Sequence, residues 1–213
     1  MKNYKQQFFE LAMTQGNLKF GEFRLKSGRV SPYFFNAGGF DDGRSLEILS
    51  ACYAQAILDS GIEFDMLFGP AYKGIPLAAG IAIMLNAGHQ KNIPFAYNRK
   101  EAKDHGEGGT LVGAELKGNV LITDDVISAG TSVRESIHWI GQAGAKVCGV
   151  AIALDRQERG QGEKSAAQEV IDEFGVPVIA IAGLDDLIDF LESQSVESID
   201  IEAIRRYRND YGI

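Results

Sequence analysis

The residue pattern with the clearest chemical meaning spans residues 120–132 and reads Val-Leu-Ile-Thr-Asp-Asp-Val-Ile-Ser-Ala-Gly-Thr-Ser. The apolar run at its start is typical of a strand buried on both faces. Asp124 and Asp125 would therefore lie at the carboxyl end of that strand. A loop of small and hydroxyl-bearing residues follows them and leads into a helical pattern.

This loop predicts a phosphate-binding site. Backbone N–H groups at a helix N-terminus have no partner within the helix, and the helix dipole adds partial positive charge there. Gly130 permits a close approach of the backbone. Hydroxyl donors come from Ser128, Thr131 and Ser132. Ser132 followed three residues later by Glu135 also predicts a capping box at the helix start.

The two aspartates would repel a phosphate unless they bind another part of the same ligand. Sugar hydroxyls, or a divalent cation carried by the ligand, would satisfy them. A phosphorylated ribose with Mg²⁺ meets both needs. The alternative is an ordinary helix start, where acidic residues are common. Neither G-x-x-x-x-G-K-[ST] nor G-x-G-x-x-G occurs in this stretch.

A second strand-to-helix junction reads Leu-Phe-Gly-Pro-Ala-Tyr-Lys-Gly-Ile-Pro over residues 67–76. Its glycines and prolines predict a tight, rigid turn that presents Tyr72 and Lys73 near a helix start. A lysine is unfavourable beside the positive end of a helix dipole, unless a polyanion completes the site. Otherwise Lys73 is an ordinary solvated surface residue.

A basic segment over residues 98–109 reads Asn-Arg-Lys-Glu-Ala-Lys-Asp-His-Gly-Glu-Gly-Gly. Its cationic or titratable side chains are Arg99, Lys100, Lys103 and His105. Such a segment gains too little burial to order itself, so we expect a mobile lid that becomes ordered against an anionic ligand. The alternative is a solvated run of charges, because neighbouring acids partly cancel the cations.

An aromatic segment near the N-terminus could recognise a flat heterocycle. Lys26 precedes a Ser-Gly turn, and Phe34 and Phe35 follow in a short predicted strand. Consecutive aromatic residues in a strand are also typical of a core, because alternate side chains must face inward.

Arg156 follows another predicted strand, in the sequence Leu-Asp-Arg-Gln-Glu-Arg-Gly of residues 154–160. A guanidinium at that edge could hold a planar carboxylate through two hydrogen bonds. The alternative is a surface arginine paired with Asp155 or Glu158. Position alone leaves both interpretations open.

The elements that must position these side chains alternate along the chain. Apolar runs typical of strands occur at residues 64–68, 95–97, 120–122, 147–154 and 178–182. Helical patterns lie between most of them, and further helical patterns cover residues 4–14, 45–59, 184–191 and roughly 196–207. This alternation predicts an α/β fold with a doubly wound, mostly parallel sheet and ligands at the strand carboxyl ends. Residues 1–40 break the rhythm and predict a small cap of one helix and two strands.

Composition limits the possible functions. A chain of 213 residues, 45% apolar and 23% charged, suits one domain over residues 1–213. A net charge of −8 argues against a general nucleic-acid binder. Two cysteines outside any metal-ligand spacing suit a reducing compartment. The N-terminus lacks the apolar core of a signal peptide, and no helical pattern is long enough to span a bilayer, so we expect a cytoplasmic location without a membrane partner.

Taken together, these motifs resemble those of type I phosphoribosyltransferases, and of orotate phosphoribosyltransferases in particular. The resemblance runs nearly end to end and rests on Lys-Ser-Gly, Gly-Pro-Ala-Tyr-Lys-Gly, the basic segment, the Asp-Asp loop and Asp-Arg-Gln-Glu-Arg-Gly. It implies that residues 1–40 form most of a hood over the base, and that the Ala71–Tyr72 peptide is cis. It also implies a homodimer in which Arg99, Lys103 and His105 complete the neighbouring site.

The resemblance further implies transfer of a phosphoribosyl group from 5-phosphoribosyl 1-pyrophosphate to orotate, giving orotidine 5′-monophosphate and pyrophosphate in pyrimidine synthesis. Mg²⁺ would be held through the substrate and water, near the two aspartates, without a direct protein ligand. The residues implied in catalysis are Lys73, Lys103, His105, Asp124 and Asp125. Those implied in binding phosphoribosyl pyrophosphate are Lys26, Tyr72, Lys73, Arg99, Lys100, Lys103, His105, Asp124, Asp125, Val126, Ile127, Ser128, Ala129, Gly130, Thr131 and Ser132. Those implied in binding orotate are Phe34, Phe35, Ser128 and Arg156.

Two other functions fit parts of the pattern. A phosphoribosyltransferase for a purine or uracil needs no partner for a carboxylate, so it would tolerate Arg156→Ala. A non-catalytic sensor of phosphoribosyl pyrophosphate would need a DNA-binding module, and neither the acidic balance nor the end sequences favour one.

Overall fold

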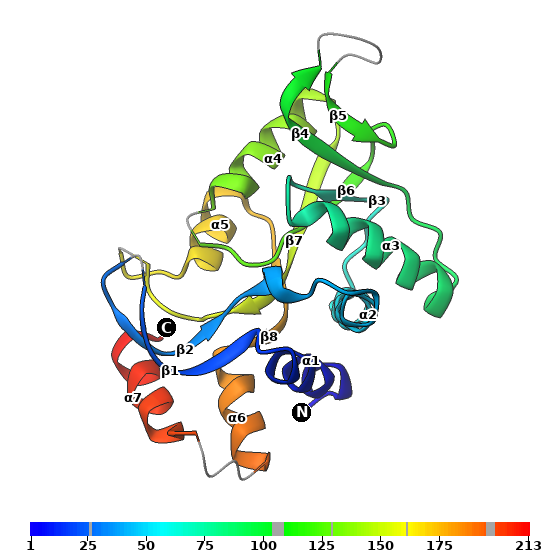
Figure 1. Ribbon diagram of the computed structural model, residues 1–213. Coiled ribbons are helices and arrows are strands. Elements are labelled where there is room, and N and C mark those ends of the chain that lie inside the picture. The colour runs from blue at the N-terminus through cyan, green and yellow to red at the C-terminus, as the bar shows by residue number, and fades with distance from the viewer. Residues whose placement is uncertain (26, 104–108, 129, 161, 195–198) are drawn as a thin grey trace.

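The structure is a computed structural model that describes residues 1–25, 27–103, 109–128, 130–160, 162–194 and 199–213. A six-stranded sheet forms its centre, in the order β5-β4-β3-β6-β7-β8 (Figure 1). The strands are β3 (Met66–Gly69), β4 (Phe95–Lys103), β5 (Gly109–Gly113), β6 (Asn119–Thr123), β7 (Lys146–Asp155) and β8 (Val178–Gly183). All neighbours in the sheet run parallel except β4 and β5. This confirms the predicted α/β fold with a mostly parallel sheet.

Helices cover both faces of the sheet. Those that contact its strands include α2 (Gly43–Asp59), α3 (Gly74–His89), α4 (Thr131–Gln142), α5 (Ala166–Phe174) and α6 (Leu184–Gln194), and α7 (Ile201–Tyr211) packs against α6. Strand β6 shows that both faces are covered, because its successive side chains point to opposite sides of the sheet. Leu121 packs in one core cluster with residues of α2 and α3, whereas Val120 and Ile122 pack in the other with residues of α4 and α5.

The N-terminal residues form helix α1 (Asn3–Thr14), a hairpin of β1 (Leu18–Arg24) and β2 (Val30–Phe35), and a short 3-10 helix (Ala37–Gly39). The hairpin is a separate two-stranded antiparallel sheet. Strand β2 contacts α7, and the Tyr33 and Tyr207 rings meet edge to face at 6.3 Å. Helix α1 instead packs into the main core, where the ring centroid of Phe9 lies 5.3 Å from that of Phe190 in α6.

The strand order explains where a ligand would bind. From β3 the chain first adds β4 on one side and later adds β6 on the other side. In open α/β sheets, ligands bind outside the strand carboxyl ends where the order reverses in this way. Here that switch point lies between β3 and β6. The topology therefore brings the turn after β3 beside the Asp-Asp loop after β6.

Strand β4 is longer than the apolar run predicted. It continues from Tyr97 through residues 98–103 and pairs with β5, which the sequence interpretation missed. The segment predicted as a lid therefore begins within this strand, which pairs with β5 through Asn98 and again at Lys103. Residues 104–108 lie outside the described residues. No helix of the described chain is long and apolar enough to cross a membrane.

Candidate functional site

The Asp-Asp loop is held rigidly at the end of β6. Asp124 and Asp125 are 7% and 9% exposed. The Oδ1 of Asp124 accepts a hydrogen bond from the backbone N–H of Asp125 at 2.9 Å, and its Oδ2 accepts one from the Ser132 hydroxyl at 2.7 Å. Behind it, the Tyr53 hydroxyl of α2 donates to the backbone oxygen of Asp124 at 2.7 Å. These contacts fix both the carboxylate and its backbone.

The start of α4 differs from the predicted capping box. Gly130 is the N-cap residue, its φ of 69° lies in the left-handed region that favours glycine, and no side chain caps this helix within the described chain. Ser132 donates to Asp124 and Glu135 is exposed, so the capping-box prediction is wrong. Ser132 lies inside the helix, two residues after the N-cap, so its hydroxyl is not placed to cap the helix and donates to the carboxylate instead.

The rest of this loop suits an anion site. Without a side-chain cap, the first N–H groups of α4 remain available to an anion. Ser128 and Thr131 are exposed beside them, whereas Val126 and Ile127 are half-buried. Ala129 lies outside the described residues.

Burial gives Asp124 unusual protonation behaviour. It raises the pKa of Asp124 to about 6, although the hydrogen bond from Ser132 opposes the shift. The carboxyl group is therefore largely ionised only above that pH. In the ionised state it can accept hydrogen bonds from the hydroxyl groups of a sugar.

The turn after β3 meets this loop directly. The Nζ of Lys73 forms an ion pair with the Oδ2 of Asp125 at 2.7 Å. A lysine is thus tolerated at the start of α3 because an acid of the neighbouring junction neutralises it. Tyr72 is 66% exposed, and the Nζ of Lys100 from β4 lies 4.8 Å from the centroid of its ring. The Ala71–Tyr72 peptide is cis, as the family resemblance implied.

Two glycines allow this turn to pack so closely. A Cβ atom at Gly74 would lie 2.5 Å from the Cδ of Pro70 and 2.7 Å from the backbone oxygen of Thr123. A Cβ atom at Gly69 would lie 2.1 Å from the backbone oxygen of Gly74. Because backbone atoms cannot move away as a flexible side chain can, only glycine fits at either position.

A cavity opens beside the ion pair. Its volume is about 240 Å³, and Tyr72, Lys73 and Asp125 form its polar edge. Its remaining walls are largely apolar and come from Ala37, Gly38, Phe40, Leu46, Leu49, Tyr53, Pro76 and Leu77. The switch point therefore offers space next to both charged groups.

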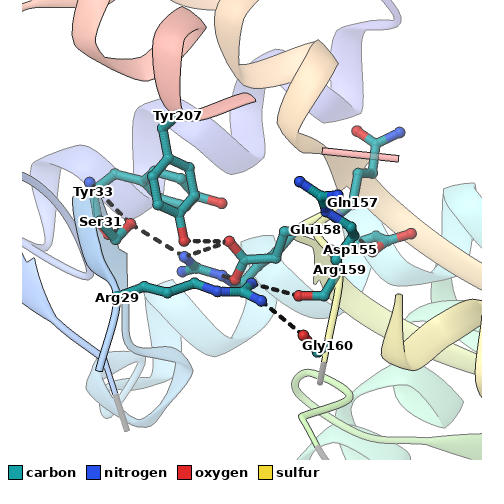
Figure 2. Close-up of polar contacts among 10 residues, drawn as sticks. Arg29, Ser31, Tyr33, Asp155, Gln157, Glu158, Arg159, Gly160 and Tyr207 are labelled. Carbon is teal, nitrogen blue, oxygen red and sulfur yellow. Dashed lines mark hydrogen bonds and ion pairs between the residues drawn. The ribbon is translucent and has the colours of Figure 1, made fainter. Parts of the chain in front are cut away.

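Arg156 directly follows β7 and is held by several partners, and Figure 2 shows Ser31, Tyr33, Glu158 and Tyr207 of this network. Its Nε donates to the Oε1 of Glu158 at 2.5 Å, and its Nη2 donates to the Ser31 hydroxyl at 3.2 Å. Its guanidinium carbon lies 4.4 Å from the centroid of the Tyr33 ring. The pairing with Glu158 that the sequence left open is present, but the pair is largely buried, with the two side chains 22% and 14% exposed.

The two consecutive phenylalanines have different surroundings. Phe35 packs against Phe8 and Phe40, at 5.7 and 6.3 Å between ring centroids, so its ring belongs to the core. Phe34 is 40% exposed and stacks on Phe23 at 5.6 Å. Phe34 is therefore the more accessible of the two rings, whereas Phe35 is half-buried against the core.

Several predicted site residues cannot be placed. Lys26 and His105 lie outside the described residues, as does the side chain of Lys103. The Nη1 of Arg99 is buried without a hydrogen-bond partner among the residues that the structure describes.

The structure adds site residues that sequence reasoning missed. Asn98 is 3% exposed, and its Oδ1 accepts a hydrogen bond from the backbone N–H of Ala71 at 2.8 Å. Tyr53 supports Asp124 in a similar way. Both lie far from their partners in the chain, so no local sequence pattern could have revealed them.

The fold and the site define a class of nucleotide-related transferase, and comparison with known proteins agrees. The family described as Phosphoribosyl transferase domain matches residues 38–180. The orotate phosphoribosyltransferases of Chromobacterium violaceum and Thiobacillus denitrificans are 62% and 59% identical, over the whole of this chain and 99% and 100% of theirs. A crystal structure of orotate phosphoribosyltransferase from Francisella tularensis superposes with a TM-score of 0.87 at 41% identity, covering 97% of this chain and 99% of that one. The chain belongs to the orotate phosphoribosyltransferases within this family.

Proposed function

We propose that the protein transfers the phosphoribosyl group of 5-phosphoribosyl 1-pyrophosphate to orotate, giving orotidine 5′-monophosphate and pyrophosphate in pyrimidine synthesis. The observation that carries this proposal is the switch point. There the uncapped start of α4, the Asp124–Asp125 pair and Lys73 meet at one sheet edge. Relatives that carry the corresponding name match the whole chain at 56% to 62% identity.

Each part of the donor substrate has a partner of suitable chemistry. The 5′-phosphate would take the N–H groups at the start of α4 and the hydroxyl groups of Ser128 and Thr131. The ribose hydroxyls would donate to Asp124 and Asp125. The pyrophosphate would lie near Tyr72 and Lys73, where its oxygens can replace Asp125 as the partner of the ammonium group.

The chemical step needs no covalent enzyme intermediate. The bond from C1′ of the ribose to the pyrophosphate oxygen breaks, and a bond from C1′ to a ring nitrogen of orotate forms. The proton that this nitrogen loses passes to solvent or to the departing pyrophosphate. The enzyme would act by positioning the reactants and by stabilising the charge that develops on the ribose and on the leaving group. Lys73, Lys100, Lys103 and His105 are the side chains proposed to take up the charge of the departing pyrophosphate.

Mg²⁺ fits the donor set of this site. Asp124 and Asp125 offer hard carboxylate oxygens, which this ion prefers. The ion would be carried by the pyrophosphate and held through substrate oxygens and water, near these two aspartates and without a direct protein ligand. When bound, it would neutralise part of the pyrophosphate charge.

We also propose a cytoplasmic homodimer that does not bind nucleic acid or membranes. Arg99, Lys103 and His105 of one subunit would complete the site of the other. In support, Figure 1 shows the β4–β5 hairpin extending beyond the rest of the sheet, and Lys103 is the last residue of β4. A segment carried on a projecting hairpin could contact a neighbouring subunit.

One assay tests the proposed function. Purified protein receives phosphoribosyl pyrophosphate, Mg²⁺ and either orotate, uracil or hypoxanthine, and consumption of each base is followed. We expect consumption of orotate alone. Consumption of uracil or hypoxanthine instead, with Arg156→Ala without effect, would identify a transferase for another base. Consumption of no base, with retained binding of phosphoribosyl pyrophosphate, would identify a sensor.

The Lys103→Ala variant tests the role of the basic segment. We expect it to lose about a hundredfold or more in turnover, because transition-state charge stabilisation is the main catalytic contribution proposed here. Its circular dichroism spectrum and thermal midpoint should stay close to those of the wild type. Near-wild-type turnover would contradict the role of this segment.

A further inference from the structure

We propose that Glu158, held by Tyr207 of the C-terminal helix α7, positions the Arg156 guanidinium for the carboxylate of the base. This inference rests on the proposed function, in which Arg156 binds orotate. It assigns Glu158 and Tyr207 a positioning role, because neither needs to touch the substrate.

The contacts form a chain of three residues from two parts of the protein, because Arg156 and Glu158 share the segment after β7 whereas Tyr207 lies in α7. Figure 2 shows Glu158 and Tyr207. The carboxylate of Glu158 accepts from the Nε and the Nη2 of Arg156, at 2.5 and 3.4 Å. Its Oε2 also accepts from the hydroxyl of Tyr207 at 2.5 Å. Tyr207 is 5% exposed, so the hydroxyl group that orients Glu158 is itself held inside the protein.

Other contacts fix the plane of the guanidinium. The guanidinium carbon of Arg156 lies 4.4 Å from the centroid of the Tyr33 ring, and its Nη2 donates to the Ser31 hydroxyl at 3.2 Å. Glu158 therefore fixes one edge of the group while Tyr33 fixes one face. Among the residues that the structure describes, none accepts a hydrogen bond from Nη1. The Nη1 group of Arg156 thus remains available to a carboxylate, and the guanidinium that carries it is held in one orientation.

The backbone that carries Arg156 and Glu158 is also tied to the C-terminus and to the N-terminal hairpin. The backbone N–H of Arg159 donates to the backbone oxygen of Tyr211 at 2.8 Å. Arg29, from the hairpin, donates to the backbone oxygens of Arg159 and Gly160, at 2.5 and 2.7 Å. Arg29 also lies 4.8 Å from the centroid of the Tyr211 ring. This support makes preorganisation of Arg156 physically reasonable, because a group already held in place loses less entropy on binding.

Two competing effects of Glu158 predict opposite results. If it positions Arg156, its loss weakens orotate binding. If it only neutralises Arg156, its loss strengthens the attraction for an anionic base. We expect positioning to dominate, because a hydrogen bond between charged partners also fixes direction. Its loss should therefore raise the KM for orotate.

The test compares Glu158→Gln and Tyr207→Phe with wild-type protein. We expect the KM for orotate to rise about tenfold in Glu158→Gln and about threefold in Tyr207→Phe, since one charged hydrogen bond or one link in the chain is lost. The kcat and the KM for phosphoribosyl pyrophosphate should stay within about twofold. An unchanged or lower KM for orotate in both variants would overturn the proposal.

Tyr211→Phe is the matched control. Tyr211 is on the same helix, and its ring lies 4.9 Å from that of Tyr207, but its hydroxyl has no hydrogen-bond partner within the described chain. This variant should keep the wild-type KM for orotate. A rise equal to that of Tyr207→Phe would show that any change in α7 suffices, which would overturn a specific role of the Tyr207 hydroxyl.

A double-mutant cycle with Arg156→Ala separates positioning from general structural support. In that background, Glu158→Gln should no longer change the KM for orotate, because it acts through the guanidinium. A persisting effect would overturn the proposal. If Arg156→Ala alone leaves the KM for orotate unchanged, the positioning proposal fails while the proposed function stands. If wild-type protein consumes no orotate, the proposed function fails as well.

Discussion

The carboxyl group of Asp124 is buried and accepts two hydrogen bonds, and this burial makes it a source of instability as well as a functional group. Its carboxyl group is held by Ser132 and by the backbone N–H of Asp125. Burial nevertheless raises its pKa from 3.8 to about 6. A raised pKa in the folded protein means that ionisation of this group costs stability.

Because ionisation of Asp124 costs stability, we expect Asp124→Asn to stabilise the protein at high pH while abolishing activity. Below pH 3.8 the carboxyl group is neutral in both the folded and the unfolded chain, so the variant gains little there. As the pH rises from 3.8 through about 6, the wild type loses stability because the buried group must ionise. Above that range the variant should be more stable by roughly 1 to 3 kcal/mol. Thermal midpoints across this pH series measure the difference.

Asp42 is a control with the opposite sign. Hydrogen bonds from the Ser45 backbone lower the pKa of this exposed N-cap carboxyl group of α2. Asp42→Ala should therefore lose stability at neutral pH, and the loss should shrink as the pH falls below the ordinary range of aspartate. A stability difference for Asp124→Asn that did not vary with pH would contradict the burial argument.

Helix α3 matters because its first residue packs against two other segments. A Cβ atom at Gly74 would collide with Pro70 and with the backbone of Thr123, next to the two aspartates. We expect Gly74→Ala to cost roughly 2 kcal/mol or more of unfolding free energy and to lose most activity, because the junctions must move apart. Denaturant unfolding and turnover of the same preparations provide the measurement.

Gly88 near the end of the same helix is the matched control. A Cβ atom there would meet no atom within 4 Å. Gly88→Ala should gain roughly 0.5 to 1 kcal/mol through reduced backbone entropy of the unfolded chain, with unchanged activity. Equal destabilisation by both substitutions would show that the close contacts at Gly74 do not matter.

The whole molecule is proposed to be a dimer with shared sites, and hybrid dimers test this. Lys103→Ala chains have an intact Asp125, and Asp125→Asn chains have an intact Lys103. If the basic segment acts across the interface, each hybrid dimer contains one complete site. Random mixing should then restore about one quarter of wild-type activity, since half of the dimers are hybrids and each has one of two sites.

The outcome of mixing distinguishes the two arrangements clearly. Each parent variant alone should have little activity, and the mixture is measured after co-expression or after unfolding and refolding together. If Lys103 acts within its own subunit, every site of the hybrid carries one defect. Activity that stayed at the level of the parents, in a mixture shown to contain hybrid dimers, would therefore contradict the shared site.

Much of the fold was predictable because apolar periodicity is a local property. The runs that became β6, β7 and β8 and the patterns of α1, α2 and α6 lie close to their observed bounds. Strand β5 and the polar half of β4 were not predictable in this way. They form through hydrogen bonding between backbone groups, which the side-chain types of a segment predict poorly.

The sequence by itself determined which chemical groups the protein has and the segments on which they lie: two acids after one strand, a lysine after another, and an arginine after a third. Only the tertiary structure decided their partners. Lys73 forms an ion pair with Asp125, and the hydroxyl of Ser132 donates a hydrogen bond to Asp124 instead of capping its helix. Arg156 forms an ion pair with Glu158, two residues away in the sequence. Glu158 in turn accepts a hydrogen bond from Tyr207, which lies in the last helix. The physical reason is that strand order and burial, rather than distance along the chain, set which charges share a low-dielectric site.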